Sequence, residues 1–204
     1  MNTSSFGIVI TSPINTYYNT TTHWFNVTSN IGASYCNYSI DGAAYILMSN
    51  DSTTHWYNNS TVLEGGHTAT FECAGPFGDT ASDFVYFTID LTKPNIQFEA
   101  PTTSGNVSQS NIEYTKMVND TNFASTTVYL YGSTGLIENI TSTSLTQYRN
   151  FFPLPDGVYY LNATAIDLAG NMNKTDTIKI MLDTTLPTLQ FEIPTTFGNN
   201  SQRP

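Results

Sequence analysis

Apolar and polar residues alternate with a period of two along most of the chain. The alternation is clear at residues 67–73, where the odd-numbered positions would share one side, and at 159–165, where the odd-numbered positions would point inward. Thr, Tyr, Phe, Ile and Val dominate these runs, and such residues favour a pleated, half-buried surface. No segment shows sustained helical periodicity. The pattern therefore predicts an all-β protein.

Turn signals divide the alternating runs into short strands. In the first half the expected strands are 8–10, 23–28, 34–40, 44–48, a segment around 56–57, 67–73 and 83–89. In the second half they are 96–98, 112–118, 127–131, 136–137, 158–166 and 177–182. About seven short strands per half, with turns every eight to twelve residues, predict antiparallel immunoglobulin-like β-sandwiches.

A repeated phrase divides the chain. Residues 95–106 (NIQFEAPTTSGN) return at 188–199 as TLQFEIPTTFGN, with eight of the twelve residues identical. A weaker relative opens the chain, where Ile8, Ile10 and Pro13 correspond to Ile96, Phe98 and Pro101 and to Leu189, Phe191 and Pro194. A repeat of this length indicates a tandem array of small domains. We expect one domain at 1–92, a second at 93–186, and a linker with the truncated start of a third at 187–204.

The phrase DLTKP (90–94) precedes the first copy and DTTLP (183–187) precedes the second. Proline fixes its own φ and restricts the residue before it to extended conformations. So short a link leaves little slack, and consecutive sandwiches should form a semi-rigid row.

Composition excludes some partners. Charged residues make up only 11% of the chain, and 16 acids against six bases give a net charge of −10. Nucleic acid and anionic lipid both require clustered Lys and Arg, which the chain lacks. We therefore expect no nucleic-acid binding and no insertion of this segment into a membrane. The sequence shows no signal peptide and no apolar run of 18 residues, and it stops within the third repeat, so we expect it to be a piece of a longer polypeptide.

Asparagine is placed unevenly. Thirteen of the 21 Asn residues begin an Asn-x-Ser/Thr triplet: Asn2, Asn19, Asn26, Asn37, Asn50, Asn58, Asn59, Asn106, Asn119, Asn139, Asn162, Asn173 and Asn199. The Ser and Thr content alone would produce roughly five. One interpretation is that Thr- and Asn-rich strands form such triplets freely. The other, which we favour, is N-glycosylation of an extracellular chain.

The two cysteines, Cys36 and Cys73, both lie in the first half. A pair within one domain of an exported chain is most simply a disulfide. Two thiols without neighbouring histidines do not complete a tetrahedral metal site. The second half has no cysteine and must be stable by packing alone.

The second half carries a family resemblance. DGVYYLNATAIDLAGN (156–171), followed by a strand and DTTLP (183–187), resembles the end of bacterial immunoglobulin-like (Big-type) domains. Tandem copies of such domains build prokaryotic surface proteins and adhesins. The first half is similar more loosely, because its turn reads GPFGD (75–79). The resemblance implies an architecture and no activity, and the dense Asn-x-Ser/Thr triplets are similar to those of archaeal cell-surface glycoproteins.

Motifs of catalysis are missing from the sequence. Gly-x-Ser-x-Gly, Ser-x-x-Lys, His-Glu-x-x-His and Cys-x-x-Cys are all absent. His23, His55 and His67 are too dispersed to suggest a ligand set, and each is expected to be a half-exposed strand residue. No pair of carboxylates is favoured for glycoside chemistry. We therefore expect no enzyme activity and no cofactor.

Two weaker binding hypotheses remain open. TTHWFN (21–26) and TTHWYN (53–58) nearly repeat, and their tryptophans are either core residues or, if Trp24, Trp56 and Tyr57 lie exposed together, a platform for sugar rings. Calcium is the second possible ligand. Asp90 or Asp183 at a joint, together with Asp167 and Asn171, offers the oxygen atoms that Ca²⁺ accepts, although Asp and Asn also dominate turns for backbone reasons.

These expectations together describe a structural segment of an extracellular prokaryotic glycoprotein, most simply an archaeal one. It would act as a stalk, filament or coat unit, with glycans, neighbouring copies or other surface proteins as partners. Copies could pair through edge strands at 8–10 or 96–98. The rival hypotheses are a module that binds a carbohydrate or a protein through the first domain's aromatics, and an accessory domain of a secreted hydrolase.

Overall fold

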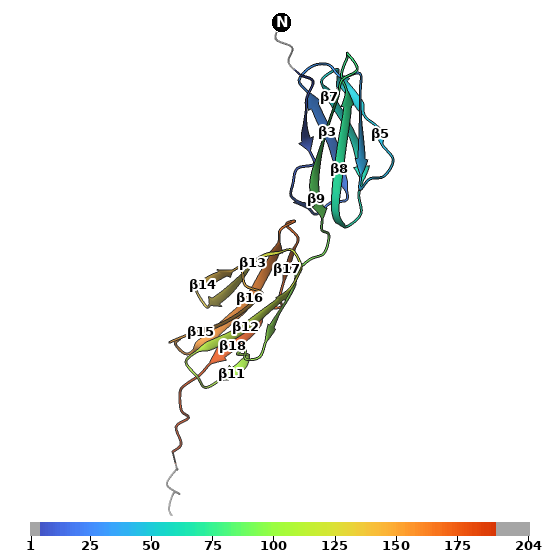
Figure 1. Ribbon diagram of the computed structural model, residues 1–204. Coiled ribbons are helices and arrows are strands. Elements are labelled where there is room, and N and C mark those ends of the chain that lie inside the picture. Colours follow the sequence, from blue (N-terminus) through green and yellow to red (C-terminus); the bar gives the residue numbers. More distant parts are fainter. Residues whose placement is uncertain (1–4, 191–204) are drawn as a thin grey trace, which may run out of the picture.

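The computed structural model describes residues 5–190, and all its regular structure is β-strand (Figure 1). The first nine strands are β1 (Ile8–Ser12), β2 (Tyr17–Tyr18), β3 (Thr22–Ser29), β4 (Tyr35–Ile40), β5 (Ile46–Leu47), β6 (Ser49–Ser52), β7 (His55–Thr61), β8 (Gly65–Ala74) and β9 (Thr80–Ile89). The next nine are β10 (Asn95–Glu99), β11 (Gly105–Val107), β12 (Ile112–Asn119), β13 (Phe123–Gly132), β14 (Gly135–Ser142), β15 (Thr146–Phe151), β16 (Gly157–Asp167), β17 (Met172–Lys174) and β18 (Ile178–Leu182). Phe191 and Pro194 of the predicted third repeat, and the candidate glycosylation sites Asn2 and Asn199, lie outside the described residues.

The first nine strands form one sandwich of two sheets. One sheet has the order β1-β3-β7-β6 and the other the order β2-β9-β8-β4-β5. All neighbours are antiparallel except β2 and β9, which run parallel. The remaining nine strands repeat the plan, with one sheet β10-β12-β15 and the other β11-β18-β16-β13-β14, to which β17 is added on β16. As in the first sandwich, a short parallel pair, here β11 with β18, lies at one edge of the larger sheet.

Each sandwich has its own hydrophobic core. In the first, the rings of Phe25 and Tyr38 stack with centroids 4.8 Å apart, and Phe71 lies 6.4 Å from Phe25. Cys36 on β4 and Cys73 on β8 lie directly opposite each other and form the predicted disulfide, with Cα atoms 4.1 Å apart. The bond therefore joins two neighbouring strands of one sheet and does not cross the sandwich.

The second core is largely aliphatic. Leu130, Leu161 and Ile180 are fully buried at its centre. Lys116 on β12 is also fully buried, and its Nζ donates a hydrogen bond to the backbone carbonyl of Ser144 and lies 5.4 Å from the ring centroid of Phe123. An ammonium group at this depth has little access to water, so it depends on these two contacts for its solvation.

The predicted faces of two strands are confirmed. Ala69, Phe71 and Cys73 are fully buried on β8, and the alternate residues from 159 to 165 are buried on β16. The strand expected at 44–48 is wrong in extent, because only Ile46–Leu47 pairs with β4 and the segment is exposed up to Met48. Strands β2, β6, β11, β15 and β17 were not predicted, since short edge strands carry little alternation.

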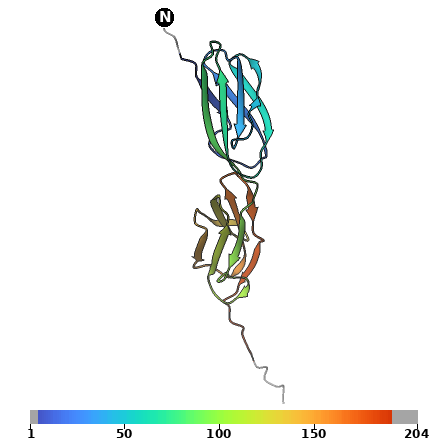
Figure 2. The ribbon, with the colours of Figure 1, turned by 45° about the vertical axis from the view of Figure 1, so that its right-hand side comes forward.

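The two sandwiches lie end to end, with β9 leading out of the first and β10 into the second (Figures 1 and 2). The long axes of both follow one general direction in the two views. Five residues, from Asp90 to Pro94, separate the strands on either side. The orientation of one sandwich relative to the other therefore depends on this connection.

Candidate functional site

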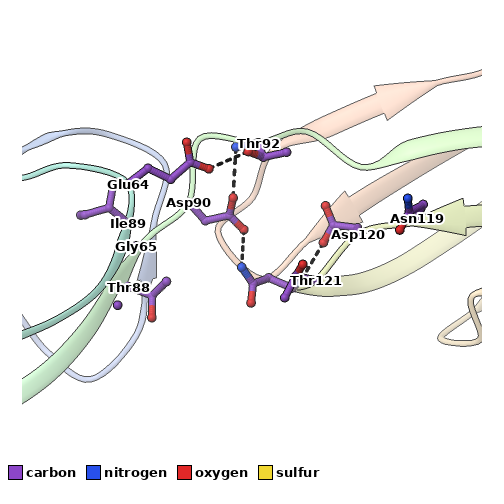
Figure 3. A pocket seen from close by; sticks show the side chains of 11 residues that line it. Glu64, Gly65, Thr88, Ile89, Asp90, Thr92, Asn119, Asp120 and Thr121 are labelled. Carbon is purple, nitrogen blue, oxygen red and sulfur yellow. Dashed lines mark hydrogen bonds between the residues drawn. The ribbon is translucent and has the colours of Figure 1, made fainter.

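Asp90 is the central residue of the connection between the sandwiches. It is 5% exposed, directly after β9. One carboxylate oxygen, Oδ1, accepts a 3.0 Å hydrogen bond from the backbone N–H of Thr92, and Oδ2 accepts one of 2.7 Å from the Asn122 side chain. The first bond closes a local Asx turn, and the second joins the linker to the second sandwich (Figure 3).

Two further asparagines of the second sandwich hold the linker backbone. The Asn171 amide donates to the carbonyl oxygen of Asp90 at 2.7 Å, and the Asn173 amide donates to that of Pro94 at 2.9 Å. Both come from the turn after β16 and from β17, so the linker lies along the upper end of the second sandwich. Because Pro94 is buried, this contact is shielded from water.

The first sandwich holds the linker from the other side. The Thr92 hydroxyl donates a 2.6 Å hydrogen bond to Oε1 of Glu64, in the turn before β8 (Figure 3). A similar arrangement occurs at the far end of the second sandwich, where Asp183 Oδ1 accepts from the N–H of Thr185 and Asp156 accepts from Thr184. The two copies of the phrase therefore make the same local turn.

Three carboxylates gather at this connection. Burial raises the pKa of Asp120 above its ordinary value, and the charges of Asp167 and Asp90 raise it further, although a hydrogen bond from the backbone N–H of Asn122 lowers it. A cleft of about 530 Å³, open to solvent, is lined by Asp90 and Asp120 and also by Glu64 and Asn119 (Figure 3). The connection is therefore negatively charged at neutral pH.

The residues considered for calcium are only partly brought together. Asp90, Asp167 and Asn171 meet at the connection, while Asp183 lies at the other end of the second sandwich. Both carboxylate oxygens of Asp167 accept hydrogen bonds from Asn171, one from its backbone and one from its side chain. Within residues 5–190 no three His, Cys, Asp or Glu side chains are arranged to hold a metal ion. Calcium binding therefore stays a prediction with little support from the geometry.

The structure separates the two tryptophans. Trp24 on β3 is 53% exposed, and its ring meets that of Tyr57 on β7 edge-on with centroids 6.0 Å apart. Trp56 is 6% exposed, lies in the first core, and donates from Nε1 to the carbonyl of Thr53. The prediction of a three-member platform is therefore wrong for Trp56, whose ring faces the opposite side of the sheet. What remains is the exposed Trp24 with the half-buried Tyr57 next to it, and His55 beside Tyr57.

Candidate glycosylation sites within the described residues all keep some exposure. Asn19, Asn50, Asn59, Asn106, Asn119 and Asn139 are exposed, and Asn26, Asn37, Asn58, Asn162 and Asn173 are half-buried. The side chains of four of them make hydrogen bonds. Asn50 donates to the carbonyl of Ser52, Asn162 to Thr177 and Asn173 to the carbonyl of Pro94, and Asn58 accepts a bond from the N–H of Asn59. Whether any of them carries a glycan stays a prediction.

The histidines do not converge. His23, His55 and His67 are half-buried strand residues, as expected. His23 and His55 bond nearby residues, Thr20 and Asp51, and His67 bonds Asp41, 26 residues earlier in the chain. Burial alone would raise the pKa of Asp41, but hydrogen bonds from His67 and from the N–H of Thr68 lower it below its ordinary value. Residues 5–190 contain no helix with the length and apolar character needed to cross a membrane.

Sequence reasoning missed three residues of the connection: Glu64, Asn122 and Asn173. Each acts across a separation of at least 28 residues, so no local pattern identifies its partner. Asn173 was considered only as a glycosylation candidate. The one available signal was the repeated Asp-x-Thr of the two joints, which indicates a turn but not what binds to it.

Comparison with known proteins supports the architecture. No family model matches the chain. No curated protein matches it either. Among solved structures, the chain is similar to the fibronectin(III)-like modules of CbhA from Clostridium thermocellum, with a TM-score of 0.54 and 15% identity over 91% of this chain and 100% of that one.

Two further structures are more distant. A tetra-tandem repeat from the extending region of a large adhesion protein gives a TM-score of 0.41, with 18% identity over 88% of this chain and 49% of that one. The D1–D4 ectodomain fragment of ICAM-5 gives 0.49, with 9% identity over 91% and 53%. At these identities the likeness to the fibronectin(III)-like modules shows the fold, and function must come from the site itself.

Proposed function

We propose that this chain is a structural, adhesive-type repeat segment of an extracellular prokaryotic surface glycoprotein, most simply an archaeal one, in which it serves as a stalk, filament or coat unit. The observation that supports this proposal is the connection between the sandwiches. A linker of five residues, from Asp90 to Pro94, makes hydrogen bonds to side chains on both sides, through Glu64 from the first sandwich and through Asn122, Asn171 and Asn173 from the second. Such a connection transmits orientation from one module to the next.

Three other observations fit an extracellular setting. The disulfide between Cys36 and Cys73 is typical of oxidising compartments. Polar surface comes mostly from Ser, Thr and Asn, with few charges. The strands β1 and β10 each pair with one neighbour only, so they are the edges through which copies or other surface proteins could associate. The lack of a catalytic role remains part of the proposal.

The test is the rigidity of the connection. We expect small-angle X-ray scattering of the chain to give a single elongated particle. The double variant Asn122→Ala/Asn171→Ala removes the two amides that bind Asp90, and should broaden the distribution of interatomic distances. Asn111→Ala is the matched control, because its amide bonds Asn150 within the second sandwich, far from the linker in the chain. A native chain as flexible as the double variant would contradict the proposal.

A second candidate function is supported by the exposed Trp24 and the half-buried Tyr57 next to it. These rings could stack on a sugar or on a partner protein. A glycan array probed with the unglycosylated chain tests this, since specific binding abolished by Trp24→Ala would favour a binding module. Tyr45→Ala, which also removes an exposed ring (50% exposed) but away from β3 and β7, is the control.

A further inference from the structure

The exposed tryptophan lies beside a glycosylation triplet. Trp24 on β3 and Asn59 on β7 are directly opposite in the antiparallel pair, so their side chains leave the sheet on the same face. Both are exposed, and the side-chain amide of Asn59 makes no hydrogen bond within residues 5–190. Thr61, the third residue of the triplet, is two positions further and therefore also on this outer face.

The structure also chooses between two overlapping triplets. Asn58-Asn59-Ser60 and Asn59-Ser60-Thr61 share two residues, and the sequence alone favours neither. Asn58 is directly opposite the fully buried Phe25, and its Oδ1 accepts a 2.8 Å hydrogen bond from the N–H of Asn59. The Ser60 hydroxyl is hydrogen-bonded to the buried Tyr38 hydroxyl. A glycan on Asn58 would start on the core side of the sheet, whereas one on Asn59 starts in solvent.

The second sandwich repeats the arrangement. Tyr129 on β13 is directly opposite Asn139 on β14 and, on its other side, Asn162 on β16. The ring of Tyr129 stacks with that of Tyr131 at 6.2 Å, which makes an aromatic surface on this outer face. Of the two asparagines, Asn139 is exposed and its side chain makes no hydrogen bond in the described chain, while Asn162 is half-buried and bonds Thr177.

We propose that Asn59 and Asn139 carry N-linked glycans and that the first sugar of each packs over the aromatic ring opposite, Trp24 and Tyr129 respectively. The C–H face of a pyranose is weakly positive and fits the negative face of an aromatic ring. The contact covers apolar surface that the fold leaves exposed. It rests on the proposed function in one respect, since the chain must meet a glycosylation system outside the cytoplasm.

The chemistry needs a donor, which is a lipid-linked phosphate or diphosphate oligosaccharide. The side-chain nitrogen Nδ2 of asparagine forms a bond to C1 of the first sugar, and Nδ2 loses one proton to a base of the transferase. The bond between C1 and the lipid phosphate oxygen breaks, and the phosphate leaves with the electron pair. No oxidant or reductant is required, and the chain supplies only the acceptor.

Site occupancy is tested with adjacent residues as matched variants. The 204-residue chain is secreted from yeast behind a leader peptide, and glycopeptides are identified by mass spectrometry. Asn59→Gln is expected to remove one glycan from the first sandwich, and Asn58→Gln none. Asn139→Gln should likewise remove one from the second. A glycan lost with Asn58→Gln, or bare Asn59 and Asn139 in the native chain, would overturn the assignment.

Packing of the sugar on the ring is tested by a double-mutant cycle. After the glycans are trimmed to a single sugar, Asn59→Gln should lower the melting temperature of the first sandwich by roughly 3 °C when Trp24 is present and leave it unchanged in the Trp24→Ala background. The chain has two tryptophans and Trp56 is buried, so loss of the glycan should also increase quenching of Trp24 fluorescence by acrylamide. Asn119→Gln is the control, because Asn119 is also exposed and is opposite Asn95 and no aromatic residue.

The outcomes separate this inference from the proposed function. Equal effects of Asn59→Gln with and without Trp24 would exclude the packing, even if Asn59 is occupied. Occupancy confined to other asparagines would refute the assignment of Asn59 and Asn139 and leave an extracellular repeat intact. A flexible connection in the scattering experiment would refute the structural proposal and leave the glycan contacts unaffected.

Discussion

The two sandwiches share one plan but are stabilised differently. The first carries the Cys36–Cys73 disulfide and a cluster of three aromatic rings, Phe25, Tyr38 and Phe71. The second contains no cysteine and buries aliphatic side chains, together with the ammonium group of Lys116. A β-sandwich therefore needs inward-facing residues of suitable size, and the particular chemistry at each inner position is free to vary.

Burying Lys116 in the second core carries an energetic penalty. Burial lowers the pKa of Lys116 below its ordinary value, because an ammonium ion is poorly solvated inside the sandwich. Its hydrogen bond to Ser144 and its position over Phe123 offset part of this penalty.

Both tryptophans lie in the first sandwich, so tryptophan fluorescence follows its unfolding, while circular dichroism follows both sandwiches. This permits the comparison to be tested.

The largest effect is expected from removing the disulfide. Cys36→Ala/Cys73→Ala opens a loop of 37 residues in the unfolded chain, and should lower the free energy of unfolding of the first sandwich by about 4 kcal/mol. Urea unfolding followed by tryptophan fluorescence measures this change. The second sandwich should keep its midpoint in the same sample. A parallel loss in both would mean that they unfold as one cooperative unit.

A core truncation in the second sandwich should have the next largest effect. Leu161 is fully buried, so Leu161→Ala is expected to lower the free energy of unfolding of the second sandwich by about 3 kcal/mol. The measurement is urea unfolding followed by circular dichroism, in which the transition that tryptophan fluorescence does not report belongs to the second sandwich. Leu136→Ala is the control on an exposed position (51% exposed) and should change the free energy by less than about 0.5 kcal/mol. Equal effects would indicate that the second core is loosely packed.

Replacing the buried lysine should stabilise the protein. Lys116→Met keeps the length of the side chain without its charge, and should raise the free energy of unfolding of the second sandwich by about 1 kcal/mol at pH 7. With a lowered folded pKa, the native state binds fewer protons than the unfolded state between that pKa and 10.5. Native stability should therefore rise with pH across this window, and the variant should lose the rise. Destabilisation by Lys116→Met would show that the bond to Ser144 outweighs the burial of charge.

The smallest effect concerns the connection. The raised pKa of Asp120 means that the folded state holds its proton more tightly, so native stability should fall as the pH rises above 3.8 through the folded pKa. Asp120→Asn should remove this fall and stabilise the chain at pH 7 by less than about 1 kcal/mol. Thermal unfolding between pH 3.5 and 7 measures it.

Asp156 serves as a control for Asp120, because its pKa is shifted in the opposite direction. Hydrogen bonds from the N–H and the hydroxyl of Thr184 lower the pKa of Asp156, against a small opposing effect of burial. Stability contributed by Asp156 is present above its ordinary pKa and is lost as the pH falls. Asp156→Asn should therefore be neutral or destabilising at pH 7. The same sign for both variants would indicate a general effect of net charge.

Much of the architecture could be predicted from the sequence because it depends on local order. Alternation identifies the inward face of a strand directly, as the buried residues of β8 and β16 show. The alternative to calcium binding, that Asp90 and Asp183 are turn residues, agrees with the structure, since each accepts a hydrogen bond from the N–H two residues further on. The asparagines that bind the linker could not be predicted, because no sequence pattern around an asparagine indicates which distant residue its side-chain amide will bond.

The two nearly identical phrases around the tryptophans show where sequence information ends. TTHWFN and TTHWYN have the same local preferences, yet Trp24 points to solvent and Trp56 into the core. On β3 the odd-numbered positions face inward, and on β7 the even-numbered positions do, because pairing sets Trp24 opposite Asn59. The sequence by itself determined that both segments are strands. Only the tertiary structure decided which face of each is buried, because a shift of one residue in a strand moves every side chain to the other side of the sheet.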